Sequence, residues 1–241
     1  MAKENTDLRT GTLYVVATPI GNLEDLTYRA VRILREAGTI ACEDTRQTLK
    51  LLTKFDIHAR LISYFQPREG QKMPLLIGLL RQGKDVALVS DSGTPGISDP
   101  GFRLIREAIR AGIKVVPIPG PSALVAAVSA SGLPTHRFVF VGFPPPKREK
   151  TRRLLRSLEG EEGTLAFYVP TRKLGEFLGL AEEAFGDREA VIARELTKVH
   201  EEFLRGSIGE LREKVESLKL RGEATVLIAG AGRTKKSFET S

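Results

Sequence analysis

The sequence predicts an α/β fold built from two α/β domains, and three observations support this prediction. Short strand-like runs alternate with amphipathic runs along the 241-residue chain, which is the pattern of α/β folds. One of these runs, 86–89, is fully apolar, as expected at the centre of a parallel sheet. The stretch 132–135 separates two such series. We therefore expect a first domain over 1–132, a second over 133–233 and a loose polar tail over 234–241.

Each expected helix of the first domain follows a strand and ends near a glycine. Ala30, Ile33, Leu34 and Ala37 share one helical face, and Gly38 closes that helix. The expected strands are 13–17, 39–42, 60–65, 86–89 and 114–118, and the expected helices are 30–37, 45–55, 75–80, 102–111 and 123–130.

The second domain repeats the alternation with fewer helices. Its expected strands are 138–141, 165–169, 190–193 and 225–229, and its expected helices are 151–158, 174–185 and 211–218.

The composition limits the classes of partner. A net charge of +7 favours an anionic partner, either nucleic acid or a polycarboxylate, although it also suits a basic surface that keeps the protein in solution. The single cysteine, Cys42, fits a reducing compartment, and the polar residues 1–9 contain no apolar signal core. No histidine pair has metal-ligand spacing, and no apolar run is long enough for a bilayer. We expect a cytoplasmic protein with no metal and no membrane partner.

The most unusual segment is 90–101, which follows the apolar strand. Its three glycines allow close backbone approach, and its two prolines stiffen it and remove backbone donors. Ligands of parallel sheets bind outside such strand ends. We expect a binding loop here, with Asp99 capping the next helix.

Two further loops lie at equivalent strand ends. The segments 17–27 and 117–123 also carry glycine and proline, and together the three loops favour one cofactor pocket. The first loop has one glycine where a dinucleotide-binding fingerprint needs three, so a nicotinamide cofactor loses its main support.

Two polar motifs follow other strands. In 43–46, Asp44 and Arg46 either serve a substrate or form a helix cap with a local ion pair, and both interpretations stay open. In 194–202, strand-like alternation would place Glu195, Thr197 and Val199 on one side. That cluster contacts a substrate or is a solvated strand end.

The sharpest charge concentration is 147–156, with six cations and one anion. Cations in the first turn of a helix oppose its macrodipole, so helix stability does not require them. A patch that contacts phosphates explains them, and a solvated charged face is the alternative.

These ordered motifs resemble the tetrapyrrole methylase superfamily, whose members use S-adenosylmethionine, and within it the branch that methylates ribosomal RNA. The resemblance extends from about Gly11 to Gly232. One departure is Ser92, where the RNA-modifying members often have alanine. The matching motifs are V-A-T-P-I-G-N-L-E-D (16–25), E-D-T-R (43–46), S-D-S-G-T-P-G-I-S-D-P-G (90–101), P-G-P-S-A (119–123), R-E-L-T-K-V-H-E-E (194–202) and G-E-A-T-V-L (222–227).

The resemblance implies a class III methyltransferase fold with a cofactor cleft between two α/β domains, and a homodimer. It implies methylation of the ribose 2′-hydroxyl of a cytidine in the decoding region of 16S rRNA, either free or in the 30S subunit. The expected S-adenosylmethionine contacts are Pro19, Asp91, Ser92, Gly93, Thr94, Ile97, Gly120, Ser122, Ala123, Tyr168, Leu196 and Ala224.

The ribose hydroxyl needs help in losing its proton, and the sequence offers several carboxylates without choosing among them. The candidate acceptors are Asp25, Glu43, Asp44 and Glu195. The candidate RNA contacts are Arg46, Arg194 and Lys198 beside the site and Lys147, Arg148, Lys150, Arg152 and Arg153 in the charged patch.

Two other functions stay open from the sequence. One is methylation of a tetrapyrrole or another small molecule, since a polycarboxylate macrocycle also favours positive charge. The other is an RNA-binding module without catalysis, against which the three stiff loops argue.

Overall fold

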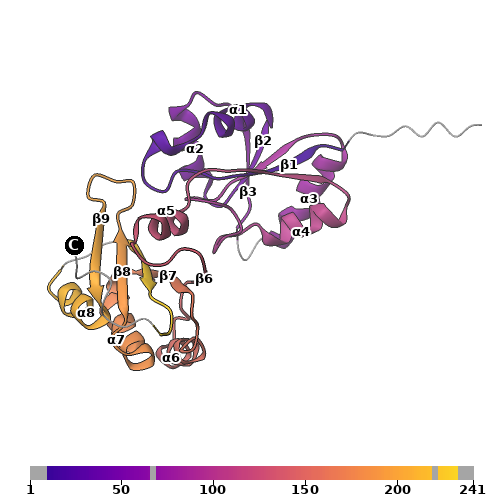
Figure 1. Ribbon diagram of the computed structural model, residues 1–241. Coiled ribbons are helices and arrows are strands. Elements are labelled where there is room, and N and C mark those ends of the chain that lie inside the picture. Colours follow the sequence, from indigo (N-terminus) through magenta and orange to yellow (C-terminus); the bar gives the residue numbers. More distant parts are fainter. Residues whose placement is uncertain (1–9, 66–68, 219–221, 233–241) are drawn as a thin grey trace, which may run out of the picture. The chain divides into compact units, whose positions relative to one another are not determined.

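Two five-stranded sheets, each with its own helices, organise the chain in the computed structural model, which describes residues 10–65, 69–218 and 222–232. The two units are Met1–Ser122 and Ala123–Ser241, and Figure 1 labels the elements of each. The predicted α/β class is confirmed. The boundary after residue 132 stays a prediction, and the expected tail 234–241 lies outside the described residues.

The sheet of the first unit is wholly parallel, in the order β3-β2-β4-β1-β5. The apolar strand β4 lies between β2 and β1, and all three of its side chains are buried, as its sequence predicts. The strands are β1 (Thr12–Val16), β2 (Thr39–Cys42), β3 (Arg60–Ser63), β4 (Val86–Leu88) and β5 (Lys114–Ile118).

Helices cover both faces of this sheet (Figure 1). Leu34 and Leu52 pack with Ile40 on one face, and Leu80 and Leu104 pack with the opposite face. Both faces of the sheet are thereby buried, as a parallel sheet requires. The helices are α1 (Tyr28–Glu36), α2 (Thr45–Lys54), α3 (Glu69–Arg81) and α4 (Phe102–Arg110), with a 3₁₀ turn η1 (Leu23–Asp25).

The sheet of the second unit is mixed, in the order β6-β7-β10-β8-β9. Only β6 and β7 are parallel, and the other three pairings are antiparallel. The strands are β6 (Phe138–Gly142), β7 (Thr164–Pro170), β8 (Glu189–Arg194), β9 (Glu202–Ser207) and β10 (Glu223–Ile228), and the helices are α5 (Ala123–Ala130), α6 (Arg148–Ser157), α7 (Leu174–Phe185) and α8 (Ile208–Glu216), with a 3₁₀ turn η2 (Thr171–Lys173).

Three expectations for this unit need correction, and one of them is the helix expected over 211–218, which the structure places at α8, Ile208–Glu216. Strand β9 was not expected, because Glu202 and Arg205 weaken its apolar alternation, and its antiparallel ladder with β8 fixes it as a strand. Helix α6 begins at Arg148 rather than at 151. Its first turn is charged, so apolar periodicity alone misses it.

Gly11 is required where the chain enters β1. A Cβ atom at Gly11 would overlap the carbonyl oxygen of Lys84, whereas a Cβ atom at Gly78 in α3 would meet nothing within 4 Å. We expect Gly11→Ala to lower the free energy of unfolding by about 1–3 kcal/mol, because the backbone must shift. The matched control Gly78→Ala should raise it by up to about 1 kcal/mol through helix propensity. Urea titration checks both, and an unchanged midpoint for Gly11→Ala would contradict the packing.

Candidate functional site

The first unit gathers its polar loops at one edge of the sheet, because all five strands are parallel and end there. Residues 17–22 follow β1, Glu43 and Asp44 follow β2, residues 89–101 follow β4, and residues 119–122 follow β5. The three glycine- and proline-bearing loops named from the sequence therefore lie at neighbouring strand ends, as predicted.

Backbone pairing joins the loops after β1 and β4. Thr18 N donates to Gly93 O over 2.9 Å, and Gly93 N donates to Thr18 O over 3.0 Å. The hydroxyl of Thr18, which is buried, also donates to Ser90 O over 3.1 Å. The two loops are thus held as an antiparallel bridge beyond the end of the parallel sheet.

The loop after β5 is attached to the same bridge. The hydroxyl of Thr94 donates to Pro121 O over 3.3 Å. Gly93 has a φ of +83°, and a Cβ atom at Gly120 would lie 3.0 Å from the Cβ of Ala17. Glycine is therefore needed both for the turn and for the close approach. Three loops form one rigid cradle with little side-chain bulk.

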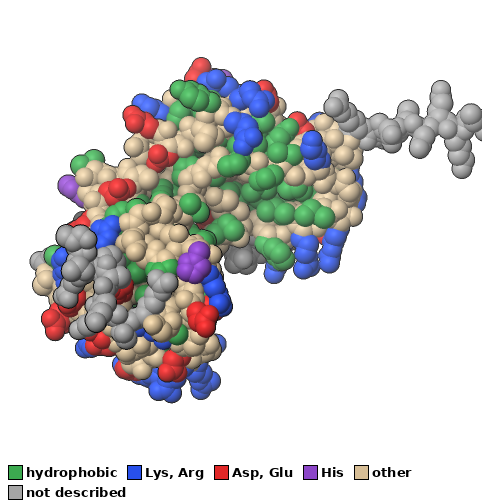
Figure 2. Space-filling model, in the orientation of Figure 1, with side chains coloured by type: hydrophobic (Ala, Val, Ile, Leu, Met, Phe, Trp, Pro, Cys, Tyr) green, Lys and Arg blue, Asp and Glu red, His purple; other side chains and the backbone are tan. Residues whose placement is uncertain are grey.

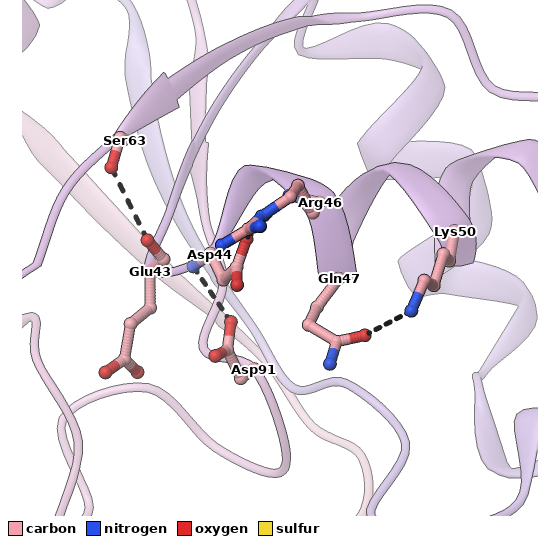
Figure 3. A network of polar contacts seen from close by, with 7 residues as sticks. All are labelled: Glu43, Asp44, Arg46, Gln47, Lys50, Ser63 and Asp91. Carbon is pink, nitrogen blue, oxygen red and sulfur yellow. Dashed lines mark hydrogen bonds and ion pairs between the residues drawn. The ribbon is translucent and has the colours of Figure 1, made fainter.

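Asp44 ties β2 to this cradle (Figure 3). Its backbone N donates to Asp91 Oδ1 over 3.0 Å, and its carboxylate caps α2 by accepting from Arg46 N over 2.8 Å. Arg46 Nε lies 3.5 Å from the same carboxylate. The cap and the local ion pair are both confirmed, and the Arg46 side chain remains 89% exposed.

The carboxylates at this edge repel one another. Burial raises the pKa of Glu43, and the nearby carboxylates of Asp91, Asp99 and Asp44 raise it further. Asp44 differs, because the hydrogen bond from Arg46 N lowers its pKa. Figure 3 shows the Glu43 carboxylate directed away from Asp44 and Ser63. An acidic edge in a chain of net charge +7 suits a ligand that carries positive charge.

Asp25 contributes a further carboxylate from η1. Its Oδ2 atom is buried and has no hydrogen-bond partner among the described residues. Such buried polar atoms are rare in folded proteins, and each calls for an explanation such as a missing ligand or water. The expected cap at Asp99 is wrong, because the N-cap of α4 is Gly101, with a φ of +135° and no side chain.

The remaining loop residues named from the sequence differ in burial. Pro19 and Gly93 are buried, Thr94 and Ser122 are half-buried, and Ile97 is 45% exposed. The side chains of Asp91 and Ser92 and the backbone of Gly120 are exposed.

In the second unit, three of the named residues lie on or just after neighbouring strands. Ala224, the second residue of β10, pairs with Val169 of β7 and with Arg194 of β8, and the buried Leu196 follows β8. Tyr168 lies one residue before Val169, so these residues gather at one end of the sheet.

Tyr168 also holds α5. Its hydroxyl accepts from Leu124 N over 3.2 Å, next to Ala123 at the start of that helix. Its ring packs against Phe140 at 4.9 Å and Phe143 at 5.4 Å between centroids. The ring of Tyr168 is thus packed between aromatic neighbours, while its hydroxyl satisfies a backbone N–H at a helix terminus.

The segment after β8 is not extended, so the predicted alternation of Glu195, Thr197 and Val199 is wrong. Glu195 and Thr197 have φ values of 49° and 66°, and a hydrogen bond from Lys198 N to Glu195 O closes a turn. Thr197 Oγ1 is buried without a partner among the described residues. A β-branched residue in this conformation is a true outlier, and sequence reasoning had no signal for it.

The charged side chains near that turn are already paired. Lys198 Nζ lies 3.1 Å from Glu195 Oε1, and Arg194 forms an ion pair with Glu202 at 2.6 Å.

The charged patch on α6 divides into two kinds of residue. Arg152 is only 22% exposed and is paired with Glu149 and Glu183, at 3.0 Å for the latter. Other cations are exposed to solvent, and Figure 2 shows blue side chains around the α6 end of the second unit. These exposed cations are Lys147, Arg148, Lys150, Arg153 and Arg156.

No cluster of three metal-binding side chains occurs in the described ranges. Every helix in those ranges is too short or too polar to cross a bilayer.

The chain is similar to known proteins over most of its length. The family model of tetrapyrrole (corrin/porphyrin) methylases matches residues 12–212. A Halalkalibacterium halodurans protein named "Ribosomal RNA small subunit methyltransferase I" is 47% identical, covering 92% of this chain and 77% of that protein. A Thermotoga maritima protein of the same name is 46% identical, covering 91% of this chain and 99% of that protein. A crystal structure of the methyltransferase CobJ shares the fold at 20% identity, with a TM-score of 0.69 over 95% of this chain and 98% of that chain.

The division of the α6 patch gives a test with a matched pair of arginines. We expect Arg153→Ala to weaken binding of a 16S rRNA fragment and to reduce the slope of log affinity against log salt by about 0.7–0.9. Arg152→Ala should leave that slope unchanged, because Glu149 and Glu183 already neutralise its guanidinium, and should instead lower the melting temperature. Equal slopes for the two variants would contradict this division.

Proposed function

The chain belongs to the tetrapyrrole methylase family, and we propose that it transfers a methyl group from S-adenosylmethionine to the RNA of the small ribosomal subunit. The observation that carries the proposal is the 46–47% identity to the two rRNA methyltransferases over nine-tenths of the chain. Within that RNA we propose the ribose 2′-hydroxyl of a decoding-region cytidine of 16S rRNA as the acceptor.

The cradle of the first unit suits S-adenosylmethionine. Gly93 permits the turn and Gly120 the close approach to Ala17 that hold the loops together, and the carboxylates around Glu43 complement a sulfonium and an ammonium group. When bound, the cofactor supplies a methyl group on a good leaving group. The first unit would hold it through Pro19, Asp91, Ser92, Gly93, Thr94, Ile97, Gly120 and Ser122, and the second unit through Ala123, Tyr168, Leu196 and Ala224.

Among the four candidate acceptors, Glu43 fits the role of proton acceptor best. A general base works best when its pKa lies near the working pH, and the pKa of Glu43 is raised. Asp44 is used as a helix cap and has a lowered pKa. Glu195 is paired with Lys198. Asp25, with its unpartnered Oδ2, would orient a bound group by accepting a hydrogen bond.

The candidate phosphate contacts are not equivalent. Arg46 is 89% exposed and lies next to the acidic edge, so it would hold a phosphate near Glu43. Arg194 and Lys198 are neutralised within the second unit and would have to exchange partners to reach RNA. The exposed α6 cations would extend the contact along the RNA backbone.

A methyl-transfer assay tests the function. Incubation with methyl-labelled S-adenosylmethionine and 30S subunits should label 16S rRNA, and nucleoside mapping should place the label on a cytidine ribose. We expect Glu43→Gln to lower kcat by about 10²–10⁴-fold, as loss of a general base does. Glu24→Gln, an exposed residue of η1, is the control and should retain full activity. Unlabelled rRNA with the parent protein would refute the proposal.

The raised pKa of Glu43 predicts the acid limb of the pH profile. The base is active when deprotonated, so the rate falls as the pH drops through its pKa, and a raised pKa starts this loss at a higher pH. Asp99→Asn removes one of the carboxylates that raise the pKa and should move the acid limb to lower pH. Asp56→Asn, at an exposed turn, is the matched control. Superimposable profiles for Asp99→Asn and the parent would exclude Glu43 as the titrating base.

A further inference from the structure

The second unit contains a pocket that the proposed reaction does not use. It has a volume of about 190 Å³ and lies between the β6–α6 connection, the end of β7 and α7. Its walls include Phe143, the three prolines that follow it and Val169, and its rim includes Arg148, Arg172 and Lys173. We call it the proline pocket.

The proline pocket is distinct from the cofactor contacts proposed above. Val169 packs in the core with α7, whereas its neighbour Tyr168 reaches Leu124 of α5. Successive side chains of a strand point to opposite faces, so Tyr168 and the Val169 wall of the pocket lie on opposite faces of β7. The volume of the pocket is also below the roughly 300–1,000 Å³ of a small-molecule site. The pocket is therefore too small for the whole cofactor.

The wall of the proline pocket is stiff and offers an aromatic ring. Phe143 is 42% exposed although it packs against Tyr168. The hydroxyl of Thr151 donates to Pro145 O over 2.7 Å, which fixes the proline segment on α6. Prolines carry no backbone N–H, so this wall is apolar and binds flat groups by contact rather than by hydrogen bonding.

The rim of the proline pocket is cationic. Arg148 and Arg172 are exposed, and neither forms an ion pair within the described ranges. Lys173 Nζ lies 3.5 Å from Pro146 O, and Glu176 is the one acid among the lining residues. A flat apolar group attached to an anion satisfies both the wall and the rim, and a nucleotide of single-stranded RNA has this chemistry.

We infer that the proline pocket binds one unpaired base of the ribosomal RNA, other than the nucleotide that is methylated. The base would stack on Phe143 and the prolines, and its phosphates would lie against Arg148 and Arg172. The pocket would then fix the register of the RNA at a second point. This inference rests on the proposed function, because it takes ribosomal RNA as the substrate.

Binding of the full chain to deproteinised 16S rRNA tests the inference. Substitutions in the wall and in the rim of the pocket should differ in their effect on the slope of log affinity against log salt. Phe143→Ala should weaken binding about tenfold without changing the salt slope, since stacking involves no counterion release. Arg172→Ala should weaken binding and reduce the slope by about 0.7. Phe138→Ala, at the other end of β6 and equally exposed at 41%, and Arg60→Ala, at the start of β3, are the matched controls and should bind like the parent.

Calorimetry with S-adenosylmethionine tests whether Phe143→Ala disturbs Tyr168, the neighbouring residue that we propose as a cofactor contact. Phe143→Ala should bind the cofactor like the parent. If it binds the cofactor more weakly, Arg172→Ala decides by the salt slope of its rRNA binding, because Arg172 lines the pocket and lies outside α6.

Parent-like rRNA binding by Phe143→Ala and by Arg172→Ala would overturn the inference, while methylation by the parent would leave the proposed function standing. A loss of binding to 30S subunits but not to free rRNA would also overturn it, because a ribosomal protein would then be the occupant. Absence of methylation by the parent is a separate failure, of the function itself.

Discussion

The reciprocal backbone hydrogen bonds between Thr18 and Gly93 are the interaction on which the candidate site depends. They join two loops whose parent strands, β1 and β4, are neighbours in the sheet, and they let Thr94 hold the third loop through Pro121. Because the backbone is satisfied internally, the cradle exists before any ligand arrives. Preorganised backbone lowers the entropic cost of binding, which is what a site for a flexible cofactor needs.

Charge is divided within the chain in a way that suits two unlike ligands. The sheet edge of the first unit is acidic around Glu43, although the chain as a whole is basic. Exposed cations of the second unit include those on α6 and around the proline pocket. The acidic surface complements a cationic methyl donor, and the basic surface complements a polyanionic acceptor. Because different residues form the two surfaces, each can match the charge of its own ligand.

Sequence reasoning predicted the parts of this structure that depend on local chemistry. The apolar run of β4 requires burial on both faces, and the glycine and proline loops follow from strand ends, so their gathering at one edge was predictable. The turn after Arg194 was not, because the left-handed conformations of Glu195 and Thr197 are imposed by the surrounding fold. The proline pocket was missed for a similar reason: its walls come from the β6–α6 connection, β7 and α7, and only tertiary packing brings them together.

A crystal structure of the protein with S-adenosylmethionine tests the central claim most directly. We expect the cofactor to lie against the paired loops at Thr18 and Gly93 and their hydrogen bonds to remain within about 3 Å, the ordinary length of such bonds. A cofactor bound elsewhere, or bound only after the Thr18–Gly93 pairing has opened, would contradict it.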